Sequence, residues 1–354
     1  MTEREMPVKL VGEHMVWFYY LLGLASAPSR SGQYEGVRSA HNRVKIAQHN
    51  HSPDKVSREY LNKLDDFDSQ FQSLSRDKIY VPGLTLPQPL TYSQVNLGNV
   101  DKSMVIIPAF AGDHYGIEPL ARESALKGYE VTTILFPESF LGESTEEFAV
   151  AMESSFRPQA LTYSPHTDYF FAAIDQLRQE NIIAPTFDLL GYSTGGAIMA
   201  ELLSNPAFSH LVTNAIILSP GSVCDQNKWS LISGFITEAP GLVPWPNNTK
   251  CVNCALTFGK NGEVDNANLS RRKRITKVLL EKVCRRSPYW TTARVREGGK
   301  LIIQIGKRDW ATKAWELAEL TNPSMKILSY PWTHLGVLYN AEKLMTDISK
   351  YLEK

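Results

Sequence analysis

What the chain lacks narrows what it can be. It contains no run of about 18 or more apolar residues, so we expect no transmembrane helix of full length. It contains no internal repeat and no low-complexity block, and with 43% hydrophobic residues in 354 it can bury a globular core. Its 37 basic and 37 acidic residues balance, and the lack of excess positive charge argues against nucleic acid as a main partner.

Cysteine is scarce, and all four cysteines fall between residues 223 and 299. Cys251 and Cys254 have the spacing of metal ligands, but Cys224 and Cys284 are single and distant, and the segment contains no histidine. Reduced thiols are therefore favoured over a zinc site or disulfides, in keeping with a cytoplasmic location. A cysteine nucleophile is not supported.

A sharp turn between a buried strand and a helix is the most informative feature that is present. The apolar run 187–190 leads into a Gly-x-Ser-x-Gly pattern centred on Ser193, and helix-favouring residues follow from 197 to 203. Gly191 and Gly195 suit this turn because a Cβ at either position would collide with the neighbouring strand or helix. The pattern indicates a nucleophile elbow with Ser193 at its apex, and an ordinary glycine turn is the alternative.

A serine nucleophile needs a base to accept its proton and a carboxylate to orient that base. Asp309 follows the β-rich run 300–306, and His334 follows a second such run at 325–330. Both are expected just past the carboxyl ends of strands, where catalytic groups gather in open α/β sheets. The chain order Ser193, Asp309, His334 is the order found in α/β-hydrolases.

Other residues compete for these roles. Asp225, which follows the predicted strand 214–219, is the alternative acid, and Asp309 could instead belong to a turn or a helix cap. A structural role is the alternative for His334. The remaining histidines precede the nucleophile or, for the last of them, follow the elbow helix too closely: His14, His41, His49, His51, His114, His166 and His210.

An oxyanion that forms during acyl transfer needs two N–H donors. Thr194, directly after the nucleophile, supplies one of them. The second should come from the loop after the third strand, and the apolar strand 104–107 runs into a loop of small residues at a suitable distance upstream.

The segment from this strand to residue 137 resembles the opening half of bacterial monoacylglycerol lipases and lysophospholipase-like esterases of the serine aminopeptidase S33 type, which are α/β-hydrolases. The resemblance covers roughly residues 100–222 and 298–354, and it is specific at the elbow and at the loops of the predicted acid and base. It implies that the amide of Phe110 is the second donor. The sequence departs from the family pattern at Pro108-Ala109, where His-Gly is usual.

Strands and helices alternate from about residue 100 to 222 and again from 300, as in a parallel sheet with crossover helices. We therefore predict an α/β protein of the α/β-hydrolase fold, with a mostly parallel, doubly wound sheet, helices on both faces and a cap inserted after the sixth strand. The predicted divisions are an N-terminal helical extension packed on the core (1–98), the first part of the core (99–222), the cap (223–299) and the second part of the core (300–354). In the extension, apolar residues recur at helical spacing from Val56 to Leu74, which predicts a helix there, and a final amphipathic helix is predicted over 341–352.

Two segments suggest contact with lipid. Residues 15–24 are nearly all apolar and are predicted to form a helix packed on the body, with an interfacial helix or an export signal as alternatives. Residues 271–286 carry eight basic residues against one acid, with apolar residues at helical spacing, which predicts a basic amphipathic helix. This helix is either a solvated face or a surface that attracts anionic head groups or an acidic substrate.

Together these features predict a serine hydrolase of carboxylic esters, a lipase or esterase of monoacylglycerol or lysophospholipid type that works through an acyl-enzyme. Ser193 is the expected nucleophile, His334 the base and Asp309 the group that orients it. An acyltransferase or thioesterase with the same triad is the first alternative, and a catalytically silent binding protein of the fold is the second. The chemistry needs no metal or organic cofactor. The expected partner is a small ester or lipid in the cytoplasm, with peripheral membrane contact through the N-terminal apolar helix or the basic cap helix, and export is less favoured.

Overall fold

The computed structural model describes residues 58–72, 74–98, 102–109, 114–139, 142–155, 162–227, 231, 266–309, 312, 325–334 and 336–353. Several positions that carry predictions lie outside this part of the chain, namely residues 15–24, Phe110, Cys251 and Cys254. Among the helices that it includes, none combines the length and the apolar character needed to cross a membrane.

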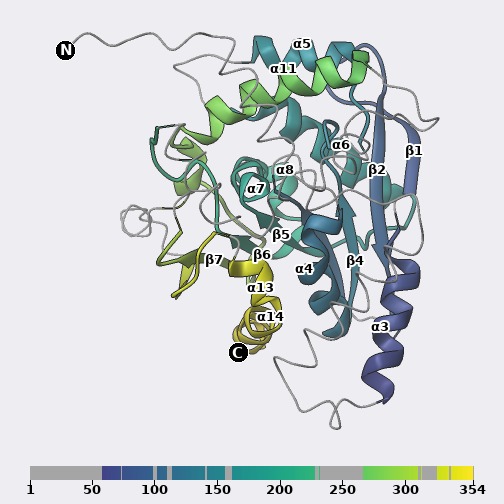
Figure 1. Ribbon diagram of the computed structural model, residues 1–354, viewed down its shortest axis with the longest axis vertical. Coiled ribbons are helices and arrows are strands. Elements are labelled where there is room, and N and C mark those ends of the chain that lie inside the picture. Colours follow the sequence, from purple (N-terminus) through teal and green to yellow (C-terminus); the bar gives the residue numbers. More distant parts are fainter. Residues whose placement is uncertain are drawn as a thin grey trace, which may run out of the picture.

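The described residues form one sheet of eight strands in the order β1-β2-β4-β3-β5-β6-β7-β8 (Figure 1). Strand β2 is antiparallel to both of its neighbours, and all other pairs are parallel. The strands span Leu74–Ile79 (β1), Gln88–Val95 (β2), Lys102–Ile107 (β3), Tyr129–Ile134 (β4), Phe187–Tyr192 (β5), Val212–Leu218 (β6), Lys300–Gly306 (β7) and Met325–Tyr330 (β8). Because β4 and β5 lie on opposite sides of β3, the winding direction reverses there, and in open α/β sheets such a reversal creates a crevice at the carboxyl ends of the strands.

The central strands contribute side chains to two apolar cores, one on each face of the sheet, because successive side chains of a strand point to opposite faces. On β3, Val105 and Ile107 belong to one core and Met104 and Ile106 to the other. Strand β3 is apolar at successive positions, and not only at alternate ones, because both of its faces are covered. The first core includes residues of α5 (Glu146–Ser154), α6 (Ser164–Gln179), α7 (Thr194–Ser204) and α8 (Pro206–Ser209), and the second those of α3 (Arg58–Gln70), α4 (His114–Leu126), α13 (Gly336–Tyr339) and α14 (Ala341–Leu352).

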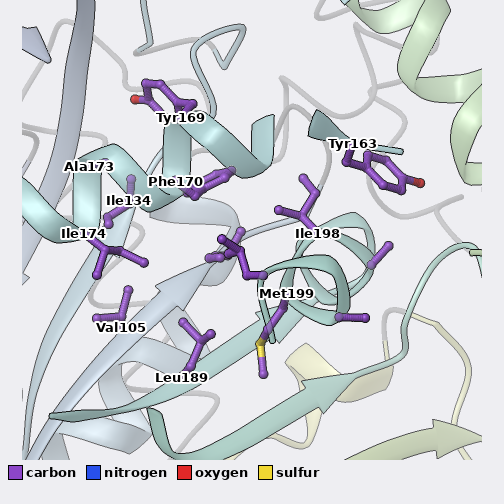
Figure 2. Close-up of a cluster of buried hydrophobic side chains, with 14 of the residues drawn as sticks. Val105, Ile134, Tyr163, Tyr169, Phe170, Ala173, Ile174, Leu189, Ile198 and Met199 are labelled. Atoms are coloured by element: carbon purple, nitrogen blue, oxygen red, sulfur yellow. The ribbon is translucent and has the colours of Figure 1, made fainter. Parts of the chain in front are cut away.

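Figure 2 shows how the first core fixes the helix that follows β5. Phe170 and Ile174 of α6 lie over Val105 and Leu189 of the sheet, and α7 adds Met199 to the same cluster (Figure 2). All five side chains are essentially inaccessible to solvent, and a fully buried side chain of this kind contributes about 1.5–3 kcal/mol. The position of α7 on the sheet is therefore set by packing, and its first turn is held at the end of β5.

The division predicted for residues 1–98 is wrong in part. The helix predicted between residues 56 and 74 is present as α3, with Leu64 and Phe67 buried, but the chain then forms β1 and β2 at the edge of the core sheet. Leu74, the last residue of the predicted helix, is instead the first residue of β1 and is exposed. The spacing of apolar residues did not reveal these strands, because a strand forms by pairing with distant partners, here β2 with β4.

The segment between β6 and β7 contains the predicted basic amphipathic helix as α11 (Asn266–Val283), followed by the short 3-10 helix η3 (Pro288–Thr291). The apolar stripe of α11 is buried, with Ile275 and Leu279 in the first core. Figure 1 shows α11 alongside α5, with which it is in contact. The predicted final helix over 341–352 is confirmed as α14.

Candidate active site

Ser193 stands at the turn between β5 and α7 in a strained backbone conformation. Its φ is 55° and its ψ is −116°, outside the regions that residues with a side chain readily adopt. Such a conformation costs about 1–3 kcal/mol and persists only where the surroundings enforce it. Here the Ser193 N–H donates to the Leu218 carbonyl at 2.9 Å, and the Gly221 N–H donates to the Ser193 carbonyl at 2.9 Å. The end of β6 and the loop after it thus hold both sides of the turn.

The two glycines that flank the serine are required by close backbone approach, as the sequence predicted. A Cβ at Gly191 would lie 2.9 Å from the Gly195 carbonyl oxygen, within the first turn of α7. A Cβ at Gly195 would meet the carbonyl oxygens of Ile107 and Pro108 at the end of β3. Helix α7 can therefore begin directly against the sheet, with Ser193 just past the carboxyl end of β5.

The structure brings the three predicted residues together. His334 Nε2 lies 2.9 Å from Ser193 Oγ, and His334 Nδ1 lies 3.0 Å and 3.1 Å from the two carboxylate oxygens of Asp309. The Asp309 side chain is inaccessible and that of His334 nearly so, whereas Ser193 is partly exposed. A carboxylate on Nδ1 fixes the tautomer that carries its proton there, so the lone pair of Nε2 faces the serine hydroxyl.

Tyr192 supports the histidine from the elbow itself, a contact that sequence reasoning missed. Its hydroxyl donates to the His334 carbonyl at 3.1 Å, and its ring stacks on the imidazole with 5.5 Å between ring centres. The residue occupies the variable position before the serine, where the motif prescribes no side chain.

The loop that carries the acid is joined to the loop of the base. The Asp309 N–H donates to the Gly306 carbonyl at 3.1 Å, and the Arg308 N–H donates to the Trp332 carbonyl at 3.0 Å. Asp225, the alternative acid, instead accepts from the Arg286 N–H at 3.2 Å. Of the two candidate acids, the structure places Asp309 against the histidine.

One of the two predicted oxyanion donors lies within the described chain. Thr194 is the first residue of α7 and is buried. The first N–H groups of a helix have no partner within the helix, so the Thr194 amide has the character of an oxyanion donor. Phe110, the second predicted donor, lies outside the described residues.

No protein-family profile matches the chain, and no curated protein matches it either. Solved structures do match. The esterase Pf2001 of Pyrococcus furiosus has a TM-score of 0.54 at 14% identity, over 81% of this chain and 92% of the esterase. The thioesterase domain from the curacin biosynthetic pathway has a TM-score of 0.50 at 13% identity, over 79% of this chain and 99% of that domain. The chain has the α/β-hydrolase fold. The narrower resemblance to monoacylglycerol lipases stays a prediction.

The basic residues of α11 have different environments that the sequence did not distinguish. Arg274 pairs with Glu146 and Glu153 of α5, and its Nη2 lies 2.6 Å from Glu153. Arg272 donates to the Gly142 carbonyl at 2.8 Å. These contacts fasten α11 to the rest of the structure. Three other cations are exposed, namely Lys277 within α11 and Arg285 and Arg286 just beyond its C-terminal end.

Lys282 of α11 differs from the other described basic residues of this helix because it is almost completely buried. Its Nζ donates to Ser155 Oγ at 2.8 Å and lies 5.8 Å from the centre of the Tyr163 ring. Burial lowers the pKa of Lys282 to about 8, and the nearby Glu201 partly opposes this shift. Burial in turn raises the pKa of Glu201, whose carboxylate accepts from the Tyr163 N–H at 2.6 Å. A polar network thus lies between α11 and the elbow helix.

Two of the other histidines, His166 and His210, have partners outside the triad. Both side chains of the pair His166 and Glu138 are inaccessible, with 3.0 Å between His166 Nε2 and Glu138 Oε2. His210 Nδ1 lies 3.1 Å from the Pro206 carbonyl. Cys224 and Cys284 are buried thiols.

Proposed function

We propose that this chain is a serine hydrolase that cleaves carboxylic esters through an acyl-enzyme. The observation that carries the proposal is the run of short contacts from the Ser193 hydroxyl through His334 to Asp309, at 2.9 Å and then at 3.0 and 3.1 Å. The positive φ of Ser193 supports it, because backbone strain of this kind is concentrated at functional sites.

In the proposed reaction, His334 Nε2 takes the Ser193 proton as Oγ attacks the ester carbonyl carbon, and the Asp309 carboxylate stabilises the imidazolium. The amides of Thr194 and Phe110 bind the oxyanion of the tetrahedral intermediate. The intermediate collapses with cleavage of the ester C–O bond, and His334 gives its proton to the leaving alcohol. Water then attacks the acyl-serine in the same way, which releases the carboxylic acid and restores the serine hydroxyl.

A lipid ester of monoacylglycerol or lysophospholipid type is the substrate class that we propose. An apolar cluster of the insert supports it: Leu231, Leu280, Val283 and Cys284. A Cβ added at Gly221 would lie 3.4 Å from Val283 Cγ1 and 3.7 Å from the Ser193 carbonyl carbon. The Val283 side chain of this buried cluster therefore packs close to the nucleophile turn, and an acyl chain is the kind of group that an apolar wall favours.

Acyl transfer and thioester cleavage use the same triad and differ in the second nucleophile or the leaving group. The likeness to a thioesterase domain favours keeping thioesters among the test substrates. The three triad side chains are all present and in contact. This argues against a silent binding protein, because a protein without activity is free to lose any of them. Peripheral membrane contact remains a prediction, with the exposed Lys277, Arg285 and Arg286 as the cations that would face anionic lipid.

The test is covalent labelling of the nucleophile together with turnover. A fluorophosphonate probe should label the wild type at Ser193 and fail on Ser193→Ala. Ser193→Ala and His334→Ala should each lower kcat by about 10⁴-fold or more on p-nitrophenyl esters from acetate to palmitate, because the triad acts as a unit. His210→Ala is the matched histidine control and should keep wild-type turnover. Labelling that persists in Ser193→Ala contradicts the assignment, and a parallel panel of monoacylglycerol, lysophospholipid and acyl thioesters ranks the substrate classes.

A further inference from the structure

Thr312 forms a bridge between two loops of the site that belong to different strands. It is buried, and it follows the Asp309 loop at the end of β7. Its N–H donates to Asp309 Oδ1 at 3.1 Å. Its hydroxyl donates to the carbonyl oxygen of Pro220, in the loop after β6, at 2.6 Å. One residue therefore binds both the predicted acid and a second segment of the chain.

The Pro220 end of this bridge leads directly to the nucleophile. The next residue, Gly221, donates its N–H to the Ser193 carbonyl at 2.9 Å, and Ser193 in turn donates its N–H to Leu218 at 2.9 Å. Asp309 is thus joined to Ser193 by two routes. One route passes through His334, and the other passes through Thr312 and the loop after β6.

We propose that the Thr312 hydroxyl is a positioning group that sets the spacing between Asp309 and Ser193, a role that rests on the proposed function. The imidazole of His334 is rigid, so its two contacts can both be short only if the acid and the nucleophile are held at a fixed separation. A misplacement of about 1 Å in such a constellation can cost about 10²-fold in rate. The Asp309 N–H fixes the acid loop to its own strand β7, whereas the Thr312 hydroxyl fixes that loop to the loop after β6, where Gly221 contacts the nucleophile.

Thr312→Val and Thr312→Ser make a matched pair for the test. Valine keeps the shape and removes the hydroxyl, and serine keeps the hydroxyl and removes a methyl group. For Thr312→Val we expect kcat on a p-nitrophenyl ester to fall by about 10- to 100-fold with KM within about threefold, because the side chain orients the acid. Thr312→Ser should stay within about threefold of wild-type kcat.

The pH profile gives a readout that general destabilisation would not move. In Thr312→Val the acid limb of kcat/KM should shift to lower pH, because a displaced carboxylate stabilises the protonated histidine less. If the valine variant does not fold, Thr312→Cys, with a weak donor of similar size, should show the same shift with a smaller loss of kcat. A valine or cysteine variant with wild-type kcat and pH profile overturns the proposal, and so does a serine variant as impaired as valine. Failure of the probe to label wild-type Ser193 would instead contradict the proposed function.

Discussion

Replacing Gly195 by alanine should disturb the elbow where the structure has least room. A Cβ at this position would lie 2.3 Å from the Ile107 carbonyl oxygen and 2.4 Å from that of Pro108. Ordinary contacts between an aliphatic carbon and a carbonyl oxygen begin at about 3.3 Å, so the start of α7 and the end of β3 must separate by about 1 Å. Both obstacles are backbone atoms next to a strand that is buried on both faces, and neither can rotate away.

The expected cost lies at the upper end of the range for overpacking, about 3 kcal/mol in the free energy of unfolding. For a chain of 354 residues that corresponds to a fall in Tm of about 4 °C. The same displacement moves Ser193 relative to His334, so kcat should fall by about 10²-fold in the protein that remains folded.

Thermal unfolding followed by circular dichroism measures the first effect, and ester hydrolysis per labelled active site measures the second. Gly221→Ala is the matched control for stability, because a Cβ there would lie 3.4 Å from Val283 Cγ1 and 3.7 Å from the Ser193 carbonyl carbon, close to ordinary contact. It should change the free energy of unfolding by less than about 1 kcal/mol. The steric reasoning is refuted if Gly195→Ala melts with the wild type, or if both alanine variants lose the same stability.

Two further predictions concern single charged groups. Asp309→Asn should lower kcat by about 10³- to 10⁴-fold, because the amide can hold His334 in the wrong tautomer. Asp225→Asn should change kcat little. The reverse result in steady-state kinetics would assign the acid to the loop after β6. The pKa of Lys282 is lowered from 10.5 to about 8 in the folded chain, so between these values the unfolded chain binds more protons and the stability of the folded state rises with pH. From pH 7.5 to 9.5 the wild type should therefore gain about 1–2 kcal/mol relative to Lys282→Met in urea unfolding, and parallel pH dependences of the two proteins would contradict a buried, pKa-shifted lysine.

The local parts of the site could be predicted from the amino-acid sequence. The glycines at 191 and 195 could be interpreted from sterics alone, and the structure shows the backbone contacts that require them. Asp309 and His334 could be located because each follows an apolar run that forms a parallel strand, and parallel strands bring their carboxyl ends to one edge. The final helix was predicted for the same kind of reason, since its periodicity is a property of neighbouring residues.

Contacts between distant segments of the chain could be assigned only from the folded structure. Asp309 and Asp225 both follow strands, and only the packing of the loops places one of them on His334 and the other at the Arg286 amide. The cations of α11 are equivalent in sequence, but they differ in the structure because α5 supplies carboxylates to some positions and not to others.

The strands β1 and β2 and the bridge made by Thr312 were missed for the same physical reason. A β-strand is stabilised by its pairing with a partner, and β2 pairs with β4 although β3 lies between them in the sequence. Thr312 and Pro220 are 92 positions apart, and the hydrogen bond between them exists only because β6 and β7 are adjacent in the sheet. Periodicity and turn chemistry act over a few residues, whereas these contacts follow from the order in which the strands assemble.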